Sequence, residues 1–521
     1  MTEQEAEMIL ALSSKISEID KMAEEKLGIP LEDLMYRAGE AVADAARQMC
    51  KAGGKITVLA GKGNNGGDGY AAALSLIRDY SVTVYDVFGV GQRSECGRSF
   101  LEKYIDGGGR VTLFEATDGV IADIKSSDLI IDAVFGTGYR GEPPEVIRVL
   151  SRIVNESSGA KKLAIDVPMG INADNGSVDT SCAVTASATV ALSLVKPGLV
   201  SFPAKAYVGR LIYDNLCLPF DKILPKFTFL YKLVDAELAR ELIPEREENS
   251  SKGTFGRMLC VTGSDKYRGA AHLSLSAALR GGVGYVTFVG TGALCDTLSS
   301  VYPEAIYLPI TSIDSISDGV IGEIVRKSAA SGATLVGSGS TVSDGLYRLV
   351  CALLSAEGGP LILDADAVNV LAEHRDEALG LIREARRTVI LTPHPLEFAR
   401  LSDSAVSDVQ LHRIEAAVKF AAENKCVLVL KGAATVTTDG TEVYINSSGS
   451  SALAKAGSGD VLAGFLTSLV ASGMPALSGA ALAVYLHGLA ADALAREYSA
   501  FSVTPSDLPL ELGRQIARLT K

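Results

Sequence analysis

The chain has 521 residues, of which 47% are hydrophobic and 21% charged, with 52 Gly, 17 Pro and no Trp. These values are typical of a globular protein and exclude a disordered, collagen-like or disulfide-scaffold chain, and at roughly 100–200 residues per domain the length predicts two to four domains. The net charge of −13 comes without a cluster of basic residues, so neither nucleic acid nor an anionic membrane is an expected partner.

Short β-branched runs alternate with helical stretches along most of the chain. In the first part the candidate strands are Lys55–Ala60, Val82–Phe88, Leu129–Ala133, Lys162–Asp166 and Ala188–Leu192. In the second part they are Met258–Thr262, Tyr285–Val289, Thr334–Gly337, Leu361–Asp364, Thr388–Thr392 and Cys426–Lys431. Apolar runs that end in Gly or Asp and lead into a helix are typical of βαβ units, so we expect an α/β protein with parallel sheets.

A domain boundary is predicted near residue 230. The most polar stretch in the middle of the chain is Pro244–Gly256, and an amphipathic helical segment, Val234–Leu242, precedes it. The glycine motifs of the two halves differ, so no internal repeat is expected. We therefore predict two unrelated α/β domains, residues 1–229 and 230–521, each with its own active site.

A glycine-rich turn is the first candidate site. Strand Lys55–Ala60 runs into GKGNNGGDG, Gly61–Gly69, before an alanine-rich helix, Tyr70–Ile77. The turn fits G-x-G-x-x-G, and Asp86 lies at about the distance along the chain expected of a ribose ligand, but the Asp68 carboxylate would repel a pyrophosphate. The turn suits a polar ligand or a cation better, and a tight strand–helix turn without a ligand remains the alternative.

Three aspartates are predicted at the carboxyl ends of strands in the first half. Asp68 lies in the glycine turn, Asp132 ends DLIID, and Asp166 ends LAID before VPMG. Because ligands of open α/β sheets bind at the carboxyl ends of strands, we expect these carboxylates to converge on one crevice. Such a cluster needs a cation or raised pKa values.

The motifs GKGNNGGDG, DAVFGTG, AIDVPMGINADNG and VKPGL, in this order, resemble the YjeF N-terminal family of NAD(P)HX epimerases. The resemblance covers roughly residues 1–225 and implies a Rossmann-like fold, a bound potassium ion and interconversion of the R and S epimers of hydrated NADH or NADPH. It also implies that Asp166 is the acid/base at the hydrated ring. The implied contacts to the substrate are Asn64, Asn65, Gly66, Gly67, Asp68, Gly136, Thr137, Gly138, Tyr139, Arg140, Gly141, Glu142 and Asp166.

The same resemblance implies that Asn65 and Asp132 bind potassium. A third ligand in the family is usually a Ser at the position of Met169. A thioether is a poor ligand for a hard cation, so at most the backbone of Met169 would serve there. We therefore expect either a backbone ligand at this position or weakened potassium binding.

In the second half, AKAGSGDVLAG places Gly457 to Gly459 and Asp460 at the start of a long apolar helix. Small residues at a helix N-terminus expose N–H groups to an anion, and an Asp beside them suits removal of a proton from the hydroxyl that is phosphorylated. The alternative is a glycine loop with an Asp cap. Lys431 and the small residues that follow suit a loop over phosphate or adenine, whereas His394 is equally compatible with a ligand contact and a packed loop histidine.

Six motifs of the second half, including VGSGS, LDADAVN, TPHPLEFARL, LKGAATV and AGSGDVLAG, resemble the ribokinase-like YjeF C-terminal family of ADP- or ATP-dependent NAD(P)HX dehydratases. The resemblance covers about residues 230–521. It implies that phosphoryl transfer to the ring hydroxyl of the S hydrate precedes loss of phosphate. The implied hydrate contacts are Ala270, Gly339, His394 and Asp460, and the implied ADP contacts are Lys431, Gly432, Ala433, Ala434, Thr435 and Gly459.

Three positions depart from the family pattern of the second half. Leu396 and Thr341 each replace a usual Gly, and Ser450–Leu453 differs from the usual run. We expect these three changes to alter affinity or rate. Asp460 and its glycines are retained.

Together these observations predict a bifunctional metabolite-repair enzyme that uses potassium in the first domain and magnesium with ADP or ATP in the second. The alternative is a vitamin or sugar-alcohol type kinase in the second half, joined to a non-catalytic ligand-binding domain. The expected partners are small molecules, without nucleic acid or membrane, and a homo-oligomer is expected.

Eight scattered cysteines without a CxxC pair predict buried thiols in a reducing compartment and no zinc site. Together with an acidic N-terminus that is no signal peptide, they predict a cytoplasmic location. The uncharged run Val461–Leu486 is interrupted at residues 472–475, which favours two buried helices over a membrane span.

Overall fold

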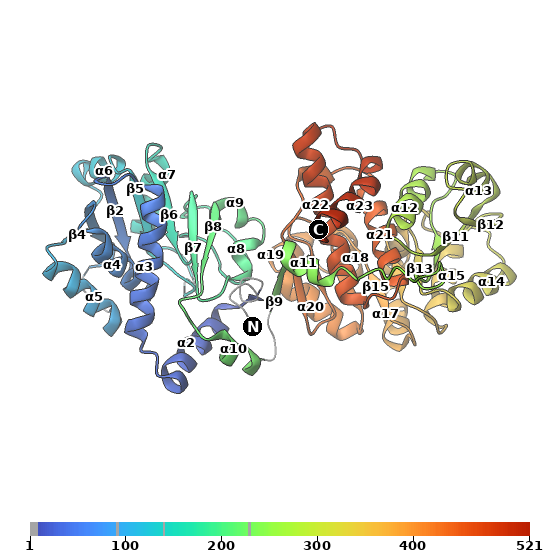
Figure 1. The fold of residues 1–521 in the computed structure, drawn as a ribbon, viewed down its shortest axis with the longest axis horizontal. Coiled ribbons are helices and arrows are strands. Elements are labelled where there is room, and N and C mark those ends of the chain that lie inside the picture. The colour runs from blue at the N-terminus through green and yellow to red at the C-terminus, as the bar shows by residue number, and fades with distance from the viewer. Residues whose placement is uncertain (1–8, 90–92, 139–140, 228–230) are drawn as a thin grey trace. The chain divides into compact units, whose positions relative to one another are not determined.

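The computed structural model describes residues 9–89, 93–138, 141–227 and 231–521, and Figure 1 shows them as a ribbon. The chain divides into two compact units, Met1–Tyr231 and Lys232–Lys521. Each unit contains a sheet with helices packed against it, so each has a hydrophobic core of its own.

The sheet of the first unit is parallel throughout and has the strand order β4-β3-β2-β5-β6-β7-β8. The strands are β2 (Lys55–Ala60), β3 (Ser81–Asp86), β4 (Arg110–Leu113), β5 (Leu129–Ala133), β6 (Lys161–Ile165), β7 (Ala188–Leu192) and β8 (Arg210–Asp214). The order reverses between β2 and β5, and a crevice opens at the carboxyl ends of the strands at such a reversal.

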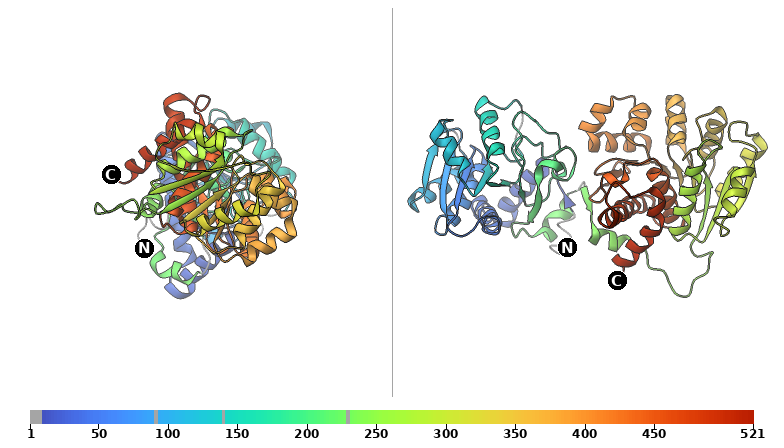
Figure 2. Two further views of the ribbon diagram at one scale, coloured as in Figure 1. Left: turned by 90° about the vertical axis from the view of Figure 1, so that its right-hand side faces the viewer. Right: turned by 90° about the horizontal axis from the view of Figure 1, so that it is seen from above.

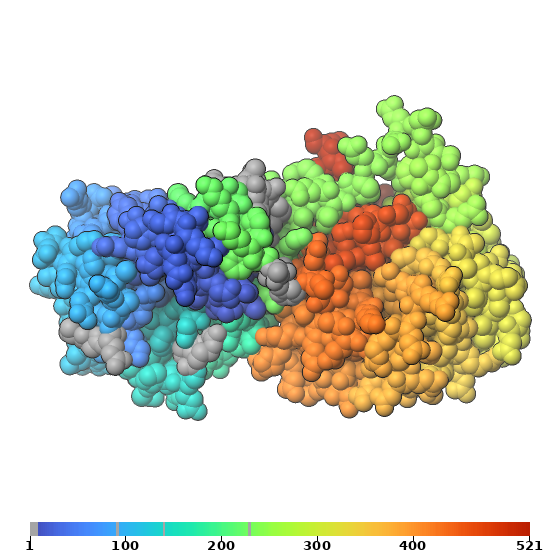
Figure 3. Space-filling view, turned by 90° about the horizontal axis from the view of Figure 1, so that it is seen from below, coloured from blue at the N-terminus to red at the C-terminus, as the bar shows by residue number. Residues whose placement is uncertain are grey.

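Strand alternation gives this sheet two apolar faces. In β2, Ile56 and Val58 lie in one buried cluster, and Leu59 lies in another. Figure 2 shows the helices on both sides of the sheet, and in Figure 3 the blue surface of α3 lies next to the light-blue surface of α5. The helices are α2 (Ser13–Leu27), α3 (Leu31–Met49), α4 (Asn64–Leu76), α5 (Glu95–Asp106), α6 (Asp118–Lys125), α7 (Glu145–Glu156), α8 (Pro197–Val200), α9 (Lys205–Val208) and α10 (Phe220–Ile223). The unit is therefore a three-layer α/β/α structure.

In the second unit the strands follow the order β9-β18-β17-β16-β15-β14-β13-β10-β11-β12. They are β9 (Tyr231–Val234), β10 (Arg257–Val261), β11 (Tyr285–Thr291), β12 (Ile306–Ile310), β13 (Ala333–Val336), β14 (Leu361–Leu363), β15 (Val389–Leu391), β16 (Val427–Leu430), β17 (Val436–Thr438) and β18 (Val443–Asn446). The pairs from β12 to β16 are parallel, whereas β16, β17 and β18 pair antiparallel.

The uncharged run of the sequence forms most of two apolar helices in the second unit. Helix α21 (Ser458–Ala471) and helix α22 (Ala476–Tyr498) are separated by residues 472–475, which confirms the predicted interruption. Helix α22 is long and apolar enough to cross a membrane, but 72% of its apolar window is buried inside the protein. The other helices are α11 (Ala236–Leu242), α12 (Arg268–Arg280), α13 (Gly292–Ser299), α14 (Asp318–Ala329), α15 (Asp344–Leu354), α16 (Asp366–Glu373), α17 (Arg375–Glu384), α18 (Pro395–Ser402), α19 (Val406–Leu411), α20 (Arg413–Asn424) and α23 (Leu508–Leu519).

Several predicted elements are corrected by the structure. Helix α4 begins at Asn64, so NNGGD forms its first turn and not a loop before it. The predicted helix from Val234 begins later, because Val234 is the last residue of strand β9 and helix α11 begins at Ala236. Strands β4, β8, β12, β17 and β18 were not predicted, because their sequences are short or partly polar. Cys217 is exposed, contrary to the expectation of buried thiols.

Candidate active sites in the two units

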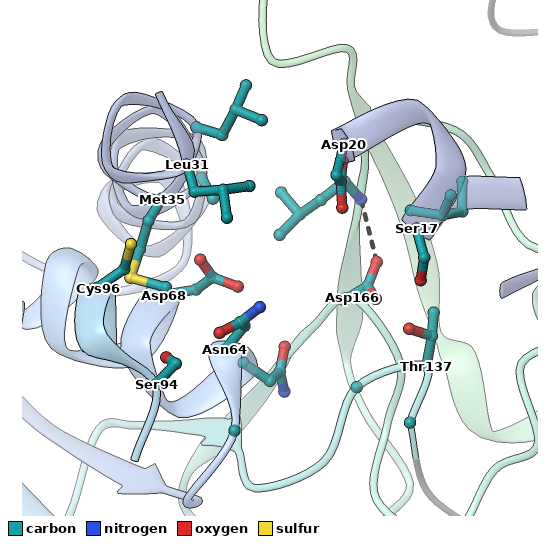
Figure 4. A pocket seen from close by; sticks show the side chains of 18 of the residues that line it. Ser17, Asp20, Leu31, Met35, Asn64, Asp68, Ser94, Cys96, Thr137 and Asp166 are labelled. Carbon is teal, nitrogen blue, oxygen red and sulfur yellow. Dashed lines mark hydrogen bonds between the residues drawn. The ribbon is translucent and has the colours of Figure 1, made fainter. Parts of the chain in front are cut away.

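A cavity of about 1090 Å³ opens in the first unit at the carboxyl ends of the central strands (Figure 4). Residues of α2, α3, α4 and the loops after β5, β6 and β7 line it. The predicted substrate contacts among its lining are Asn64, Asn65, Asp68, Gly136, Thr137, Gly138, Glu142 and Asp166. The fold thus brings residues from three separate sequence motifs to one cavity.

A buried ion pair lies in this cavity. The Lys196 ammonium bonds to Asp166 Oδ1 and donates to the Leu192 carbonyl oxygen at 2.7 Å. The Lys196 side chain is 1% exposed. Asp166 follows β6 with a φ of 63°, a strained conformation for a residue other than Gly. The fold therefore holds a charged pair, at some conformational cost, at the edge of the sheet. The sequence analysis had noted Lys196-Pro197-Gly198 but gave Lys196 no role.

Two further carboxyl groups line the same cavity. Burial, followed by the charges of Asp166 and Asp20, raises the pKa of Asp68 well above its ordinary value, and Lys196 opposes this. Burial raises the pKa of Asp20 to about 6, where Lys196 lowers it and Asp166 raises it. The Lys196 ammonium pairs with Asp166 and lowers the pKa values of Asp20 and Asp68, so three carboxyl groups share one positive charge. Asp20 was missed by the sequence analysis, since an Asp on an amphipathic helix has no local pattern to distinguish it.

Asp132 does not join this group, which corrects the expectation that three aspartates converge. It is absent from the cavity lining, is 1% exposed, and accepts hydrogen bonds from the backbone N–H groups of Met169 at 2.8 Å and Val134 at 3.2 Å. Burial raises its pKa to about 6, and those two amides lower it. No described basic side chain lowers the pKa of Asp132. A bound cation would therefore stabilise the ionised form of this carboxyl group.

The surroundings of the other predicted potassium ligands differ. The Asn65 amide donates to the Phe135 carbonyl oxygen at 2.8 Å, which leaves its own oxygen beside Gly136. The Met169 side chain is fully buried in an apolar cluster, and its carbonyl oxygen accepts a bond from the Val184 N–H. The Met169 sulfur is thus held by apolar packing.

Gly66 and Gly67, two of the remaining predicted contacts, have packing roles. A Cβ on Gly66 would lie 2.0 Å from the backbone oxygen of Gly61, and one on Gly67 would lie 2.6 Å from the Met35 sulfur. Gly141 does not line the cavity. Tyr139 and Arg140 lie outside the described residues.

The predicted ribose ligand, Asp86, is engaged elsewhere. It is buried and forms an ion pair with Arg93, whose guanidinium also lies over the ring of Tyr70 and bonds to its hydroxyl. This pairing removes the observation that suggested an ordinary dinucleotide site.

In the second unit a second carboxylate–lysine pair lies at the ends of β14 and β16. Lys431 Nζ lies 2.9 Å from Asp364 Oδ1, and Asp364 also accepts bonds from Thr392 at 2.7 Å and Ser338 at 2.8 Å. A Cβ on Gly459 would lie 3.4 Å from the same ammonium, so Lys431 is at the N-terminus of α21. Two predicted nucleotide contacts are thereby adjacent.

Asp460 lies in the first turn of α21 beside this pair. Burial, followed by the charge of Asp364, raises its pKa to about 7, with Lys431 lowering it and Asp366 raising it. A carboxyl group with a pKa near neutrality is suited to accept a proton from a substrate hydroxyl.

His394 caps helix α18 through a capping box. Its Nδ1 accepts from the N–H groups of Leu396 and Glu397 at 3.2 Å, and Glu397 accepts from the His394 N–H at 2.8 Å. Nε2 therefore carries the ring proton and lies 3.3 Å from Glu397 Oε1. Leu396 is 45% exposed, so its side chain fits where the family usually has Gly.

The loops around these groups adopt conformations that favour glycine. Thr341 has a φ of 70° at the position of a usual Gly, and its N–H donates to Asp366 Oδ2 at 2.8 Å. A Cβ on Gly339 would lie 2.5 Å from the Ala270 Cβ, so these two predicted hydrate contacts adjoin. Gly432 and Ala434 also have positive φ in the loop between β16 and β17, which carries Ala433 and Thr435.

His487, which belongs to none of the sequence motifs, lies near the second site. His487 on α22 is 5% exposed, its Nε2 has no described partner, and burial lowers its pKa to about 4. It interacts with the backbone of Ser458 and with the charge of Lys431.

Comparisons with known proteins give the chain a family. The family model described as the YjeF-related protein N-terminus matches residues 31–198, and the one described as NAD(P)H-hydrate dehydratase matches residues 258–514. The bifunctional NAD(P)H-hydrate repair enzyme of Moorella thermoacetica is 34% identical over 516 residues, which covers 96% of this chain and 95% of that protein. The chain belongs to this family of repair enzymes.

Other members of the repair-enzyme family match as broadly. The protein of the same name from Escherichia coli is 30% identical over 493 residues, 94% of this chain and 90% of that one. An ADP/ATP-dependent NAD(P)H-hydrate dehydratase from Bacillus subtilis, co-crystallised with ATP and Mg²⁺, is 32% identical, with a TM-score of 0.48, and covers 55% of this chain and 97% of that one. The predicted family and the Rossmann-like and ribokinase-like α/β fold are thus confirmed.

Proposed function

We propose that this protein restores hydrated nicotinamide nucleotides, with the epimerase in residues 1–229 and the dehydratase in residues 230–521. The first site would interconvert the R and S hydrates of NADH and NADPH, and the second would dehydrate the S hydrate with ADP or ATP. The observation that carries this proposal is that each unit holds its own buried carboxylate–lysine site: Asp166 with Lys196, and Asp364 with Lys431 beside Asp460.

In the first site Asp166 is the proposed acid/base at the carbon that bears the hydroxyl. Its ion pair with Lys196 holds the carboxyl group at the edge of the cavity, where it can accept a proton from the substrate. Asn64 and Asp68 on α4 and Thr137 after β5 lie around the same cavity and would orient the substrate. We assign Lys196 to this site as a residue that the motifs did not reveal.

In the second site Asp460 is the proposed base. It would take the proton of the ring hydroxyl as that oxygen attacks the terminal phosphorus of the nucleotide, and the phosphorylated hydrate would then lose phosphate with the help of the ring nitrogen. The N–H groups at the start of α21 and the Lys431 ammonium would bind phosphate oxygens. Ala270, Gly339 and His394 would contact the hydrate, and the segment from Gly432 to Thr435 would contact adenosine.

Two of the three predicted potassium ligands in the first unit have side chains suited to this ion. Asp132 is a buried carboxyl without a described cation, and the Asn65 oxygen is a hard donor of the kind potassium prefers. Met169 would contribute no side-chain ligand, because its sulfur lies in an apolar cluster. We propose that Asn65 and Asp132 hold the ion with backbone carbonyl groups, and that it supplies positive charge that neutralises Asp132.

Magnesium is proposed to accompany the nucleotide in the second unit. Asp364 and Asp366 are carboxyl groups at the end of β14, near Lys431 and Asp460. Carboxylates together with nucleotide phosphates are the usual ligands of Mg²⁺, and the ion would offset the phosphate charge. Small molecules are the proposed partners, and the cytoplasm is the proposed location.

The test is absorbance at 340 nm after the full chain is added to a mixture of R and S hydrated NADH with ADP, Mg²⁺ and K⁺. Recovery of all the NADH is expected, since the S epimer alone supplies only part of it. Recovery that stops at the S fraction would contradict the epimerase assignment. No recovery with either ADP or ATP would contradict the dehydratase assignment and favour a kinase.

A further inference from the structure

Helix α2 forms one wall of the first cavity, although it precedes the residues that match the family model. The residues of α2 that line the cavity are Ile16, Ser17, Asp20 and Glu24. Their spacing puts them on one face of the helix, while Ile19 and Ala23 are fully buried in the core on another. The helix therefore presents two carboxyl groups, Asp20 and Glu24, to the site.

The start of α2 is anchored to both chain segments that carry the ion pair. The N–H and hydroxyl groups of Ser13 donate to Asp174 Oδ1 at 2.7 and 2.6 Å, in the loop that follows Asp166. The N–H of Ala11 donates to the carbonyl oxygen of Val195 at 3.0 Å, next to Lys196. These bonds fix Asp20 relative to the reacting groups.

The charge of Lys196 acts on both Asp20 and Asp68. Lys196 is the largest charge acting on Asp20, whereas it is the smallest of the three charges acting on Asp68. Figure 4 shows Asp20 above Asp166 on the same side of the cavity, with Asp68 on the opposite side. Burial raises the pKa of Asp20 to about 6, so Asp20 retains a proton at a higher pH than an ordinary aspartate and lies on the same side of the cavity as the Asp166–Lys196 pair.

Epimerisation of the hydrate needs both a proton donor and a proton acceptor. The hydroxyl is attached to a carbon next to the ring nitrogen, so it leaves as water only after it takes up a proton. Water then returns to the other face of that carbon and gives up a proton. A lone carboxylate paired with lysine provides the acceptor but not the donor.

We propose that Asp20 is the proton donor of the epimerase and that Asp166, paired with Lys196, is the acceptor. This proposal rests on the proposed function of the first unit. The hydroxyl takes the proton of Asp20 and leaves as water, while the nitrogen lone pair forms a C=N bond. Water adds to the same carbon and gives a proton to Asp166, which releases it to water in the cavity while Asp20 takes a proton from that water. Every group is then restored, so no oxidant or co-reactant is consumed.

The test compares Asp20→Asn with the unchanged full chain, using the R hydrate as substrate and chromatographic separation of the epimers. We expect kcat to fall by about 100-fold or more, with KM changed less than about threefold, because an acid and not a binding contact is lost. In the unchanged protein kcat/KM should fall as Asp20 loses its proton at rising pH, and this limb should be absent from the variant. The charged groups that face Asp20 are Lys196, Asp166 and Asp68, and they shift the position of the limb together.

Glu25→Gln is the matched control, because Glu25 lies on the same helix, is exposed and does not line the cavity. Its kcat should stay within about twofold of the unchanged value. Dehydration of the pure S hydrate should proceed normally in both variants, which reports that the second unit is folded, and a near-unchanged KM for the R hydrate reports that the cavity of the first unit is intact. An Asp20→Asn variant with full epimerase kcat would overturn the inference alone, whereas an unchanged protein that does not epimerise the R hydrate would overturn the proposed function.

Discussion

Buried carboxyl groups in both units have pKa values displaced toward neutrality, and burial is the largest cause for each. Asp20 and Asp132 titrate near pH 6 and Asp460 near pH 7. Groups of this kind cost folding free energy once they ionise, so a protein retains them where they perform chemistry or bind a cation.

Asp460→Asn should lower the dehydratase kcat by about 10²–10⁴-fold, because the asparagine amide cannot accept the hydroxyl proton. The measurement is NADH formation from the pure S hydrate with ADP and Mg²⁺. A base works in its ionised form, so the unchanged rate should rise as the pH rises through about 7. A variant with a near-normal rate would remove Asp460 from the mechanism.

Asp132 allows a test of potassium that does not depend on activity. Its folded pKa of about 6 exceeds the ordinary 3.8, so the stability it contributes is present below pH 3.8 and is lost as the pH rises through 6. At about 1.4 kcal/mol per pKa unit the loss is about 3 kcal/mol. Potassium should offset this loss, so KCl should raise the Tm of the unchanged chain at pH 7.5 above its value in LiCl. Asp132→Asn should abolish the difference, and Asp79→Asn, at an exposed position, should preserve it.

At the scale of elements, close packing of helices depends on glycines with no room for a Cβ. Helix α21, which carries Asp460, crosses α12 where a Cβ on Gly464 would lie 2.1 Å from the Ser274 backbone oxygen. This contact is between backbones, so no side chain can move aside to relieve it.

Gly464→Ala should therefore lower the free energy of unfolding by about 1–3 kcal/mol. Gly513 lies within helix α23 with nothing within 4 Å of its added Cβ, so Gly513→Ala should instead raise it by up to about 1 kcal/mol. Urea denaturation of both variants measures the difference. Equal effects would show that the α12–α21 approach is less close than described.

The same scale explains which elements were predictable. The buried parallel strands β2, β5, β7 and β16 have nearly continuous apolar sequences, so the sequence predicted them within a residue or so. Strand β4 is largely exposed and β8 only half-buried, and neither has such a run. Helix α4 was placed too late because Asn and Gly disfavour helix interiors, whereas here close packing of Gly66 and Gly67 outweighs that preference.

On the scale of the whole molecule, the two proposed sites lie in separate units and would share one intermediate. The S hydrate made by the first would be consumed by the second, and the residues of each proposed site belong to a single unit. An equimolar mixture of an Asp166→Asn chain and an Asp460→Asn chain should therefore recover all the NADH from mixed hydrates. Each variant alone should fall short, and absorbance at 340 nm measures this. A mixture that also stops at the S fraction would indicate that the intermediate does not pass through solution.

The sequence alone determined the family, the α/β class of both halves and several residues that line the first cavity, because glycine turns and strand ends are local features that adjacent residues specify. Asn64, Asp68 and Asp166 were predicted in this way and line one cavity. The tertiary structure alone decided which charges meet. It paired Lys196 with Asp166, brought Asp20 from α2 to both, and separated Asp132 from them. Those relations depend on contacts between residues far apart in the chain and on the burial they share, neither of which a local pattern specifies.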